Sequence, residues 1–224
     1  MSLHILPELE QGTPEWHDAR RGLVTASVVG KLVTAKTLKV ASNDESRGLT
    51  ALLVAERITG WTDPTYVNAD MQRGVDEEPR ARDLYSEKYA PVTEVGFMVR
   101  REPGWTLGFS PDGLVGDDGL IEVKAPRAKA HIRTILSGEV PPYHMAQLQA
   151  GLLVSGREWV DFISWCGGLP MWVKRVLPDE RWQVVIVEAV TQFENNAAEM
   201  VAAYEQATKG LAQTERPLDL EMVI

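Results

Sequence analysis

The sequence predicts a fold of the α/β or α+β class, in which helices lie on both sides of a central sheet. Residues 13–89 carry mostly helical patterns, whereas residues 91–126 form short runs separated by glycine and rich in β-branched and aromatic residues. Helical patterns return after residue 127, interrupted by one further pair of runs typical of strands. Helices, then strands, then helices fit a layered architecture that buries one face of each element.

The N-terminal helices have recognisable boundaries. Thr13 is a suitable N-cap and Pro14 suits the first helical position, so a helix should begin there. A second short helix is predicted to begin near Thr25–Ser27. Residues 34–45 lose helical periodicity and are predicted to form a loop.

The longer helices follow. One is predicted to end at Gly60, because glycine favours the left-handed conformation that closes a helix. The next is interrupted by Pro79, which should kink or restart it. The remaining helices are predicted over residues 127–138, 142–155 and about 179–209.

The strands are predicted from short alternating segments. Residues 116–119 read Gly-Asp-Asp-Gly, a composition typical of a hairpin turn, and the strands around them should be antiparallel. A second strand pair is expected around a Gly-Gly-Leu-Pro connection. The predicted strands lie within residues 91–100, 105–110, 112–116, 119–126, 158–166 and 171–178.

Composition indicates an ordinary soluble protein. The chain has 224 residues, of which 44% are hydrophobic and 25% charged, and no internal repeat or low-complexity linker divides it, so we expect one domain over 1–224. No run of apolar residues is long enough for a membrane span, and no signal-peptide pattern is present, so a cytoplasmic location is expected. Cys166 is the single cysteine, which excludes an internal disulfide and cysteine-based zinc or iron–sulfur sites.

The net charge of −9 argues against a protein that coats DNA without specificity, because phosphate neutralisation requires a positive face. It does not exclude a local basic groove beside an acidic site. Basic residues do gather in short groups: Arg20–Arg21, Lys36, Lys39, Arg80, Arg82, Arg100–Arg101, Lys124, Arg127, Lys129 and Arg133.

The predicted hairpin over 108–128 carries chemistry that a plain hairpin does not need. Glu122 and Lys124 are two residues apart in a strand, so both point to one face while Ile121 and Val123 face the core. Asp112 lies on the opposite arm, where the turn can bring it beside Glu122. Two carboxylates and a nearby backbone carbonyl suit Mg²⁺, and a lysine beside them could stabilise the charge of phosphodiester hydrolysis. Burial or a nearby cation could lower the lysine pKa toward that of a general base.

The alternative is a surface hairpin in which Glu122 and Lys124 form a solvated salt bridge. An aspartate followed later by a Glu-x-Lys sequence is common on ordinary surfaces. The context here is more specific, since the aspartate follows Ser110–Pro111, the Glu-x-Lys strand is flanked by apolar residues and Pro126 follows.

These motifs resemble the PD-(D/E)xK nuclease superfamily and, more narrowly, the lambda-exonuclease or YqaJ-like viral recombinase family of phage alkaline exonucleases. The segment SPDG, followed ten residues after its aspartate by EVK, carries the superfamily resemblance. The narrower resemblance rests on residues 10–27, 73–85 and 143–156, and it extends over residues 10–165. It implies a restriction-endonuclease-like fold with a central mixed sheet flanked by helices.

The resemblance assigns roles to the hairpin. Asp112 and Glu122 fall on metal-ligand positions, Lys124 on the catalytic lysine and the carbonyl of Val123 on a further ligand position. Glu78 falls on the helical glutamate that completes the metal site. Its neighbour Glu77 is the alternative by one residue, and both could instead lie on a solvated acidic helix face.

The resemblance also implies a 5′-phosphate pocket. Arg20 falls on the anchoring position, with Ser27 and Ser110 as hydroxyl partners, and a guanidinium with hydroxyl donors is chemically suited to a phosphate. The alternatives are a surface arginine and an N-cap serine. Gln147 falls where the family orients the attacking water or the scissile phosphate, although it and Gln149 could be buried and bound to backbone.

Three further expectations concern contacts with DNA. Met71 falls where relatives present an apolar wedge to the terminal base pair, although a core position is the alternative. His131 and His144 are expected to have structural or DNA-contacting roles, and Trp16 is expected in the core. The loop 34–45 has lysines but no arginine, so an arginine contact that relatives make there must be replaced or lost.

The function that the resemblance implies is a Mg²⁺-dependent 5′→3′ exonuclease acting at double-stranded DNA ends, with two ions and with Mn²⁺ as an alternative metal. It would release mononucleotides and leave a 3′ overhang for a single-strand annealing protein, as a ring-shaped homotrimer of phage origin in a bacterial host. The alternatives are a PD-(D/E)xK endonuclease and a non-catalytic DNA-end-binding protein.

Overall fold

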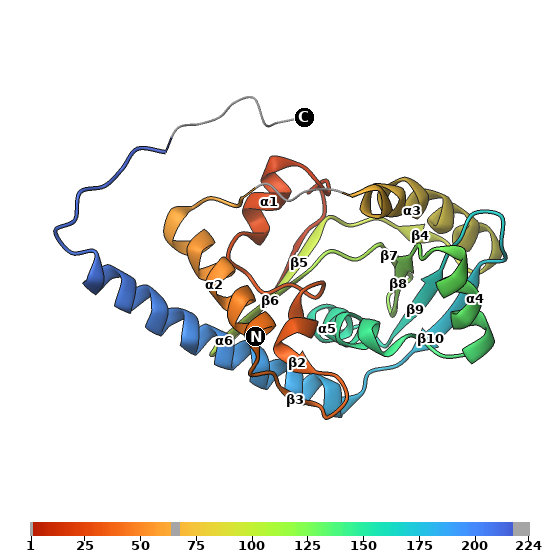
Figure 1. Cartoon of the computed structure of the whole chain (residues 1–224). Coiled ribbons are helices and arrows are strands. Elements are labelled where there is room, and N and C mark those ends of the chain that lie inside the picture. The colour runs from red at the N-terminus through yellow and green to blue at the C-terminus, as the bar shows by residue number, and fades with distance from the viewer. Residues whose placement is uncertain (1, 64–67, 217–224) are drawn as a thin grey trace.

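The computed structural model describes residues 2–63 and 68–216. Within them the chain forms helices and strands in three sheets, and Figure 1 shows their arrangement. The helices are α1 (Pro14–Arg20), α2 (Asp44–Thr59), α3 (Ala69–Lys88), α4 (Ala128–Ser137), α5 (Met145–Ser155) and α6 (Glu180–Ala207). The strands are β1 (Ser2–Leu6), β2 (Val33–Thr34), β3 (Lys39–Val40), β4 (Val92–Thr93), β5 (Phe97–Glu102), β6 (Trp105–Phe109), β7 (Gly113–Val115), β8 (Gly119–Lys124), β9 (Trp159–Ser164) and β10 (Trp172–Val176).

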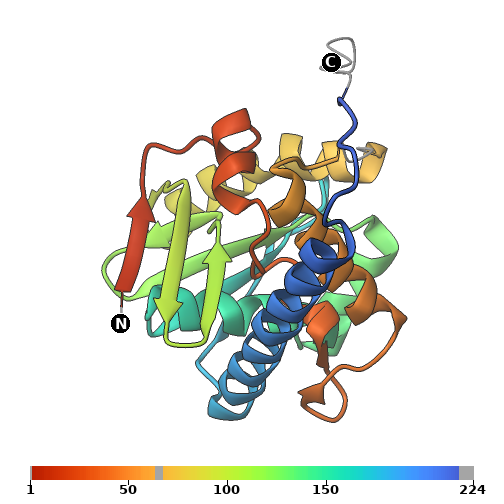
Figure 2. The same ribbon diagram turned by 90° about the vertical axis from the view of Figure 1, so that its left-hand side faces the viewer.

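The main sheet is mixed, as the sequence predicts. Its strand order is β10-β9-β8-β7-β4, in which β8 and β9 are parallel and the other neighbours are antiparallel. α4 and α5 form the connection between the two parallel strands, as expected for a crossover that must return to the same sheet edge. A second sheet has the order β1-β5-β6, and Figure 2 shows β1 at its outer edge.

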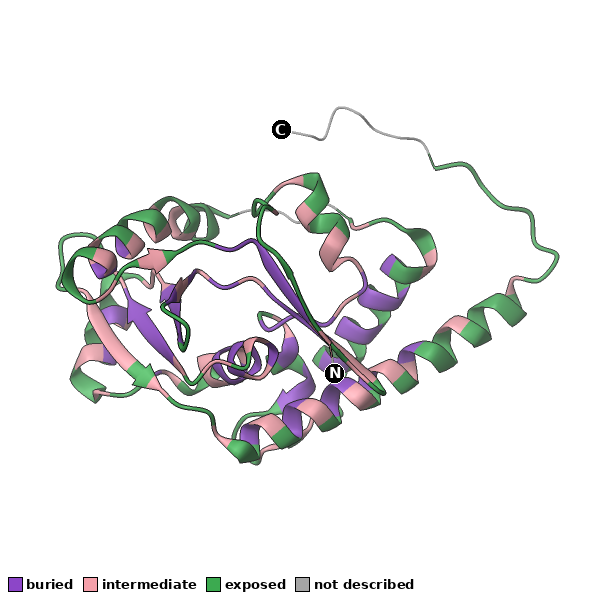
Figure 3. Ribbon diagram, turned by 180° about the vertical axis from the view of Figure 1, so that it is seen from behind, coloured by how far each residue is buried: buried purple, intermediate pink, exposed green. Residues whose placement is uncertain are grey.

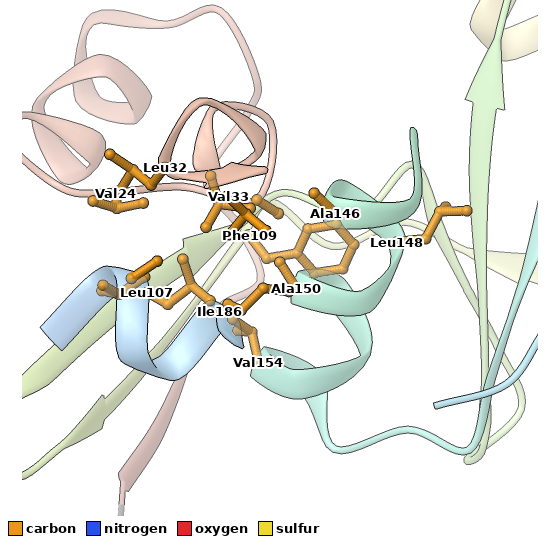
Figure 4. Close-up of a cluster of buried hydrophobic side chains, with 14 of the residues drawn as sticks. Val24, Leu32, Val33, Leu107, Phe109, Ala146, Leu148, Ala150, Val154 and Ile186 are labelled. Atoms are coloured by element: carbon orange, nitrogen blue, oxygen red, sulfur yellow. The ribbon is translucent and has the colours of Figure 1, made fainter. Parts of the chain in front are cut away.

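Both faces of the main sheet are covered. α3 packs against β4 and β8, and its Ala81 and Tyr85 lie in one cluster with Ile121, Val123 and Ile163. The opposite face packs against α5 and belongs to the larger core, part of which is drawn in Figure 4. Burial on both faces explains why β8 consists almost entirely of buried residues (Figure 3).

The larger core joins the second sheet, α5 and α6. Leu107 and Phe109 of β6 contact the same cluster as Ala150 of α5 and Ile186 of α6, as Figure 4 shows. The N-terminal segment around Val24 completes this cluster. The core therefore holds β6 in place, and the candidate site lies where the chain leaves this strand.

Several expected boundaries are confirmed. The side chain of Thr13 accepts the backbone N–H of Trp16 at the start of α1. Gly60, with φ 61°, closes α2 in the left-handed region. The Gly-Asp-Asp-Gly turn joins the antiparallel pair β7 and β8, and β9 pairs with β10.

Other local expectations were wrong. The short helix expected to begin near Thr25–Ser27 is present as a 3₁₀ helix, but it begins later, at Val29, because Thr25 bridges to β6. The segment 34–45 contains the small β2–β3 hairpin and the start of α2. α3 runs through Pro79 without restarting, so that alternative was wrong, whereas the kink expected there stays a prediction.

One strand was not predicted, and the burial of one site residue was predicted only in part. β1 was not foreseen, because its pairing with β5 lies more than ninety residues away in the chain. The strand alternation placed Ile121 and Val123 toward the core, but Glu122 on the other face is buried as well, with a relative exposure of 2%. Single-strand periodicity cannot show that α5 covers this second face.

Candidate active site

Two groups of polar side chains meet at the segment that joins β6 to β7. β6 ends at Phe109 and β7 begins at Gly113, so the residues between them connect the second sheet to the main sheet. From this segment Ser110 contacts Arg20, while Asp112 contacts the backbone of β8. The two groups predicted from the sequence are therefore linked by one short piece of chain.

Arg20 forms a pocket with hydroxyl and aromatic groups. Its Nη1 donates to Ser110 Oγ at 3.1 Å, and its Nη2 lies 3.4 Å from Thr25 Oγ1 and from Ser27 Oγ. The guanidinium carbon lies 3.9 Å from the centroid of the Trp16 ring. None of the ion pairs found in the described parts of the chain involves Arg20. Burial lowers the pKa of Arg20 to about 10, and among the described residues no carboxylate pairs with this cation.

The chain around this pocket is held by backbone pairing to β6. Ala26 N–H donates to the carbonyl of Gly108 at 2.8 Å, and Gly108 N–H donates to the carbonyl of Val24 at 2.9 Å. A Cβ at residue 108 would lie 2.5 Å from Phe97, which explains the glycine at this close approach. The pairing holds the Thr-Ala-Ser segment, a bridge residue followed by a turn, beside Arg20, and that local sequence is the signal that could have identified Thr25.

Trp16 has a different role from the core position expected. No residue of α1 is buried, and the indole of Trp16 is only half-buried. Its Nε1–H donates to Ser110 Oγ at 3.0 Å while its ring supports the guanidinium of Arg20. Trp16 therefore holds two members of the pocket in place, and a cation over a tryptophan ring is a favourable contact.

The second group contains the hairpin carboxylates. Asp112 Oδ2 accepts the backbone N–H of Val123 at 2.6 Å. Glu122 Oε1 accepts from Lys124 Nζ at 2.6 Å and from Gln147 Nε2, which α5 supplies. The register that places Gly113 opposite Ile121 brings the two carboxylates together from neighbouring strands. The structure thus brings together the hairpin residues and Gln147, as the sequence predicted.

Glu78 completes this carboxylate site from α3. Burial and then the charge of Asp112 raise the pKa of Glu78 to about 7, although Arg82 and Lys124 oppose the shift. Arg82 Nη2 donates to Glu78 Oε1 at 2.7 Å. The interaction with Asp112 and Lys124 places Glu78 beside the hairpin residues.

Glu77 points elsewhere, which decides between the two adjacent glutamates. It pairs with Arg73 at 3.1 Å along the helix. It also lines a cavity of about 450 Å³ together with Arg127, Cys166 and Gly167. Glu78 is therefore the glutamate that α3 presents to Asp112.

The carboxylate site holds more negative charge than its cations balance. Burial and then the charge of Asp112 raise the pKa of Glu122 to about 8, while Lys124 lowers it by less. Burial also raises the pKa of Asp112, against the charge of Lys124 and the N–H of Val123. Carboxylates that resist ionisation mark a place where an added cation is favoured.

The lysine differs from the expectation. Burial lowers the pKa of Lys124, but Glu122, Asp112 and Glu78 raise it by more, so the pKa of Lys124 lies above its ordinary value. Burial alone therefore does not lower this pKa as expected, because the carboxylates outweigh it, whereas the lowering expected from a bound cation stays a prediction. In this structure Lys124 donates to Glu122.

The donor set of this site suits Mg²⁺. In the described ranges, no three His, Cys, Asp or Glu side chains lie in an arrangement that could hold a metal ion together as they stand. The available donors are nevertheless oxygens from Glu78, Asp112 and Glu122, with the carbonyl of Val123 adjacent, and hard divalent cations prefer oxygen ligands. The excess negative charge points the same way. The residues therefore fit a Mg²⁺ site in which the cation competes with the N–H and ammonium donors.

Two of the remaining residues, Gln149 and His131, are buried and structural, whereas His144 is half-buried and its role stays a prediction. Gln149 is fully buried, donates to the carbonyl of Leu177 at 2.8 Å and accepts the N–H of Asp179 at 2.8 Å, so it ties α5 to the start of α6. His131 is also buried, with its ring nitrogens bonded to Ser164 and to the carbonyl of Pro170. His144 packs against Phe162, with ring centroids 5.3 Å apart.

The residues expected to contact DNA lie at the surface. Met71 in the first turn of α3 has a relative exposure of 48%, so the core alternative is excluded. Lys36 and Lys39 are exposed on the β2–β3 hairpin. Their roles toward DNA stay predictions.

Comparison with protein families supports one assignment. Residues 15–158 match the model of the YqaJ-like viral recombinase domain. A search of curated protein sequences found no match. Over the residues that the structure describes, no helix has the length and apolar character of a transmembrane segment.

Solved structures of similar fold include an alkaline exonuclease, LHK-Exo, from Laribacter hongkongensis. It shares 35% sequence identity with this chain, with a TM-score of 0.79, and the match covers 89% of this chain and 100% of the other. LHK-Exo in complex with dAMP matches with a TM-score of 0.78 at the same identity and coverage. A phage-related exonuclease from Haemophilus somnus 129PT matches with a TM-score of 0.57 and 12% identity over 80% of this chain and 96% of the other, which shows the fold alone.

Proposed function

The chain belongs to the YqaJ-like viral recombinase family, and we propose that it is a Mg²⁺-dependent exonuclease that degrades the 5′ strand of duplex DNA from an end. The observation that carries the proposal is the link between Ser110 and Asp112. This link joins a cationic pocket, in which no carboxylate of residues 2–63 and 68–216 pairs with Arg20, to a carboxylate site with excess negative charge. A terminal phosphate suits the first, and a metal-assisted cleavage of the next phosphodiester suits the second.

The Arg20 pocket is suited to the 5′-phosphate. The guanidinium offers several N–H donors in a fixed plane, and hydroxyls of Thr25, Ser27 and Ser110 surround it. A terminal phosphate carries more charge than an internal phosphodiester and has more free oxygens, so such a pocket selects a strand end. Anchoring the 5′ end here places the first internal phosphodiester toward Asp112, which gives the reaction its 5′→3′ direction.

The reaction is hydrolysis of that first phosphodiester. A water oxygen forms a bond to phosphorus, the bond from phosphorus to the 3′ oxygen of the terminal nucleotide breaks, and the leaving oxygen takes a proton. The products are one 5′-mononucleotide and a strand shortened by one nucleotide that carries a new 5′-phosphate. The crystal structure of LHK-Exo in complex with dAMP supports a mononucleotide product.

The residues of the carboxylate site divide this chemistry. Asp112, Glu122, Glu78 and the carbonyl of Val123 would hold Mg²⁺, as one or two ions, which lowers the pKa of bound water and stabilises the leaving oxygen. Lys124 keeps its proton and stabilises negative charge on the phosphate oxygens.

Gln147 is placed to organise the same site. In this structure its Nε2 donates to Glu122. Once Glu122 binds a cation, the same amide can orient the attacking water or a phosphate oxygen. This assignment follows the position of Gln147 on α5 directly over β8.

We extend the proposal to the assembly and the biological setting. The family resemblance supports a ring-shaped homotrimer around the duplex, a 3′ overhang used by a single-strand annealing protein, and a phage origin within a bacterial cytoplasm. Mn²⁺ is expected to replace Mg²⁺, because both accept oxygen ligands. Sedimentation of the purified protein tests the trimer, and a monomer at working concentration would contradict it.

The experiment that tests the activity uses three substrates in Mg²⁺. Linear duplexes with and without a 5′-phosphate, labelled on either strand, are compared with a covalently closed circle. We expect mononucleotides from the 5′ strand of the linear duplexes, faster with the phosphate, and an intact circle. Cleavage of the circle would identify an endonuclease, and end binding without hydrolysis in Mg²⁺ or Mn²⁺ would identify a binding protein.

A further inference from the structure

A buried hydrogen-bond network lies one sheet position away from the carboxylate site and is not used by the proposed reaction. Tyr85 of α3 has a relative exposure of 1%, and its hydroxyl donates to Asp161 Oδ2 at 2.6 Å. Asp161 lies on β9 and is itself 3% exposed. Arg175 of β10 donates to both oxygens of Asp161, from Nε at 2.8 Å and from Nη2 at 2.9 Å.

The charges in this network are balanced, unlike those of the carboxylate site. The bidentate contact with Arg175 compensates the buried charge of Asp161, and the guanidinium lies 3.5 Å from the centroid of the Trp159 ring. Tyr85 is the member that comes from outside the sheet. Burial and Asp161 raise the pKa of Tyr85 above its usual range, so the hydroxyl keeps its proton as a donor at alkaline pH.

Tyr85 and Glu78 lie on the same face of α3. They are seven residues apart, which is close to two helical turns or about 10.5 Å along the axis. Ala81 lies between them on this face and is fully buried. One face of the helix therefore makes three contacts in a row: a carboxylate at the site, a methyl group against the sheet and a hydroxyl at β9.

The register of the sheet places Asp161, the partner of Tyr85, close to the strand residues of the carboxylate site. Asp161 on β9 pairs with Ile121 on β8, the residue next to Glu122. The Tyr85 hydroxyl is thus fixed to the same pair of strands that carries Glu122. A rotation or an axial shift of α3 that moved Glu78 away from Asp112 would also break the hydrogen bond from Tyr85 to Asp161.

The other contact of Glu78 does not fix this position. Arg82 donates to Glu78, but Arg82 is on the same helix and its other partner, Glu94, is mostly exposed. The helical pair would move together with α3. Among these contacts, the polar connection that runs from this face of α3 to the strand beside β8 is that of Tyr85.

We propose that Tyr85 is a positioning residue that, through Asp161, sets the place of Glu78 relative to Asp112 and thereby the affinity of the carboxylate site for Mg²⁺. This inference rests on the proposed function of that site. Tyr85 touches neither the substrate nor the cation in this account. Its effect is a matter of helix placement.

The test measures cation binding separately from catalysis. In Tyr85→Phe the ring keeps its packing, and Asp161 keeps both bonds to Arg175, so the fold is retained. We expect the dissociation constant for Mg²⁺, measured by calorimetry and by the Mg²⁺ dependence of the melting temperature, to rise about three- to tenfold, less than for a direct outer-shell partner. DNA hydrolysis at saturating Mg²⁺ should stay within about twofold of the wild type, since the catalytic groups are unchanged.

The matched control is Tyr89→Phe. Tyr89 is an exposed tyrosine whose ring stacks on that of Tyr85 with centroids 4.9 Å apart. Removing its hydroxyl should leave the dissociation constant for Mg²⁺ unchanged. An equal increase in both variants would contradict a specific role of the hydroxyl of Tyr85.

A double-variant cycle tests whether Tyr85 acts through Glu78. In a Glu78→Gln background, Tyr85→Phe should cause no further loss of Mg²⁺ affinity, because the group it positions is already removed. An additive loss would overturn the inference, and so would a Tyr85→Phe protein with wild-type Mg²⁺ affinity. If either of these variant results is found while the wild type binds Mg²⁺ and digests DNA, the inference about Tyr85 fails and the proposed function stands. If the wild type neither binds Mg²⁺ nor digests DNA, both the proposed function and the inference fail.

Discussion

The Arg20 pocket and the carboxylate site have unbalanced charges of opposite sign. In the pocket, hydroxyls and an indole surround one cation, and burial lowers the pKa of Arg20. In the carboxylate site, Glu78, Asp112 and Glu122 face one another with too little positive charge, and their pKa values are raised. Ser110 of the pocket and Asp112 of the carboxylate site are two residues apart in the chain.

This difference shows how an unbalanced site indicates its ligand. A buried cation without a carboxylate favours an anion, and buried carboxylates in excess favour a cation. The Asp161 network is a useful contrast, because its charges already compensate each other. A phosphodiester substrate with a divalent metal supplies both missing charges at once.

The largest expected effect comes from removing the ammonium group of Lys124 from the carboxylate site. Lys124→Met keeps most of the apolar stem of the side chain but leaves the developing phosphate charge unbalanced, so hydrolysis should fall about a hundred- to a thousandfold. Single-turnover digestion of a 5′-phosphorylated duplex measures it. The exposed Lys129 on α4 provides the matched control, as Lys129→Met, and should retain full activity. Activity of Lys124→Met within tenfold of wild type would contradict the assigned role.

The next effect is on stability and separates the two adjacent glutamates. Mg²⁺ at a hundredfold excess over its dissociation constant should stabilise the wild type by about 2.7 kcal/mol, or about 5–10 °C in melting temperature. In Glu78→Gln this increase should shrink markedly, because a ligand is lost. In Glu77→Gln, which removes only the pairing with Arg73, it should persist. Equal losses in both variants would show that the structure assigns the wrong glutamate.

A smaller effect should appear at the pocket. Arg20→Met removes the cation that we assign to the terminal phosphate, so digestion of a 5′-phosphorylated end should fall about ten- to thirtyfold, at the lower end of the range for charged hydrogen bonds. Digestion of a 5′-hydroxyl end should change little. The ratio of the two rates is the measurement, with the exposed Arg47→Met as control. A uniform loss on both ends would indicate general DNA binding at Arg20.

The smallest effect is a pH dependence beside the carboxylate site. Burial, and then the charge of Lys124, lower the pKa of His144 from 6.5 to about 4. The folded state therefore disfavours the imidazolium. The contribution of neutral His144 to the free energy of unfolding is complete above pH 6.5 and is lost as the pH falls toward 4. His144→Phe should make the decline of unfolding free energy between pH 6.5 and 4 smaller by about 1 kcal/mol, which is less than the roughly 3 kcal/mol of the full shift because water screens the partly exposed imidazole. Parallel urea titrations measure it, and identical slopes would contradict this environment for His144.

Much of the carboxylate site could be predicted from the sequence because its geometry is local. A strand alternates sides at every residue, so Glu122 and Lys124 had to share a face. A short turn brought Asp112 next to them, and the glycines made that turn recognisable. The same reasoning could not show that Glu122 is buried under α5, since that depends on a helix that enters more than twenty residues later.

The pocket was predictable only through the motif that carries it. Its members lie ninety residues apart, and a bridge between Thr25 and Gly108 brings them together. Pairing of this kind holds Thr25 against β6, so the short helix expected to begin near Thr25–Ser27 begins only at Val29. Long-range backbone pairing leaves no periodic trace in either partner, which is also why β1 was not foreseen.

The sequence by itself determined the class of fold, the hairpin with its two carboxylates and lysine, and the family to which the chain belongs. Those features depend on residues close together in the chain or on the order of motifs. Only the tertiary structure decided that Glu78 and not Glu77 faces Asp112, that the pKa of Lys124 is raised and that Gln149 is structural. Each of these depends on which charge or helix lies nearby in space, and the balance of burial against charge exists only once the chain is folded.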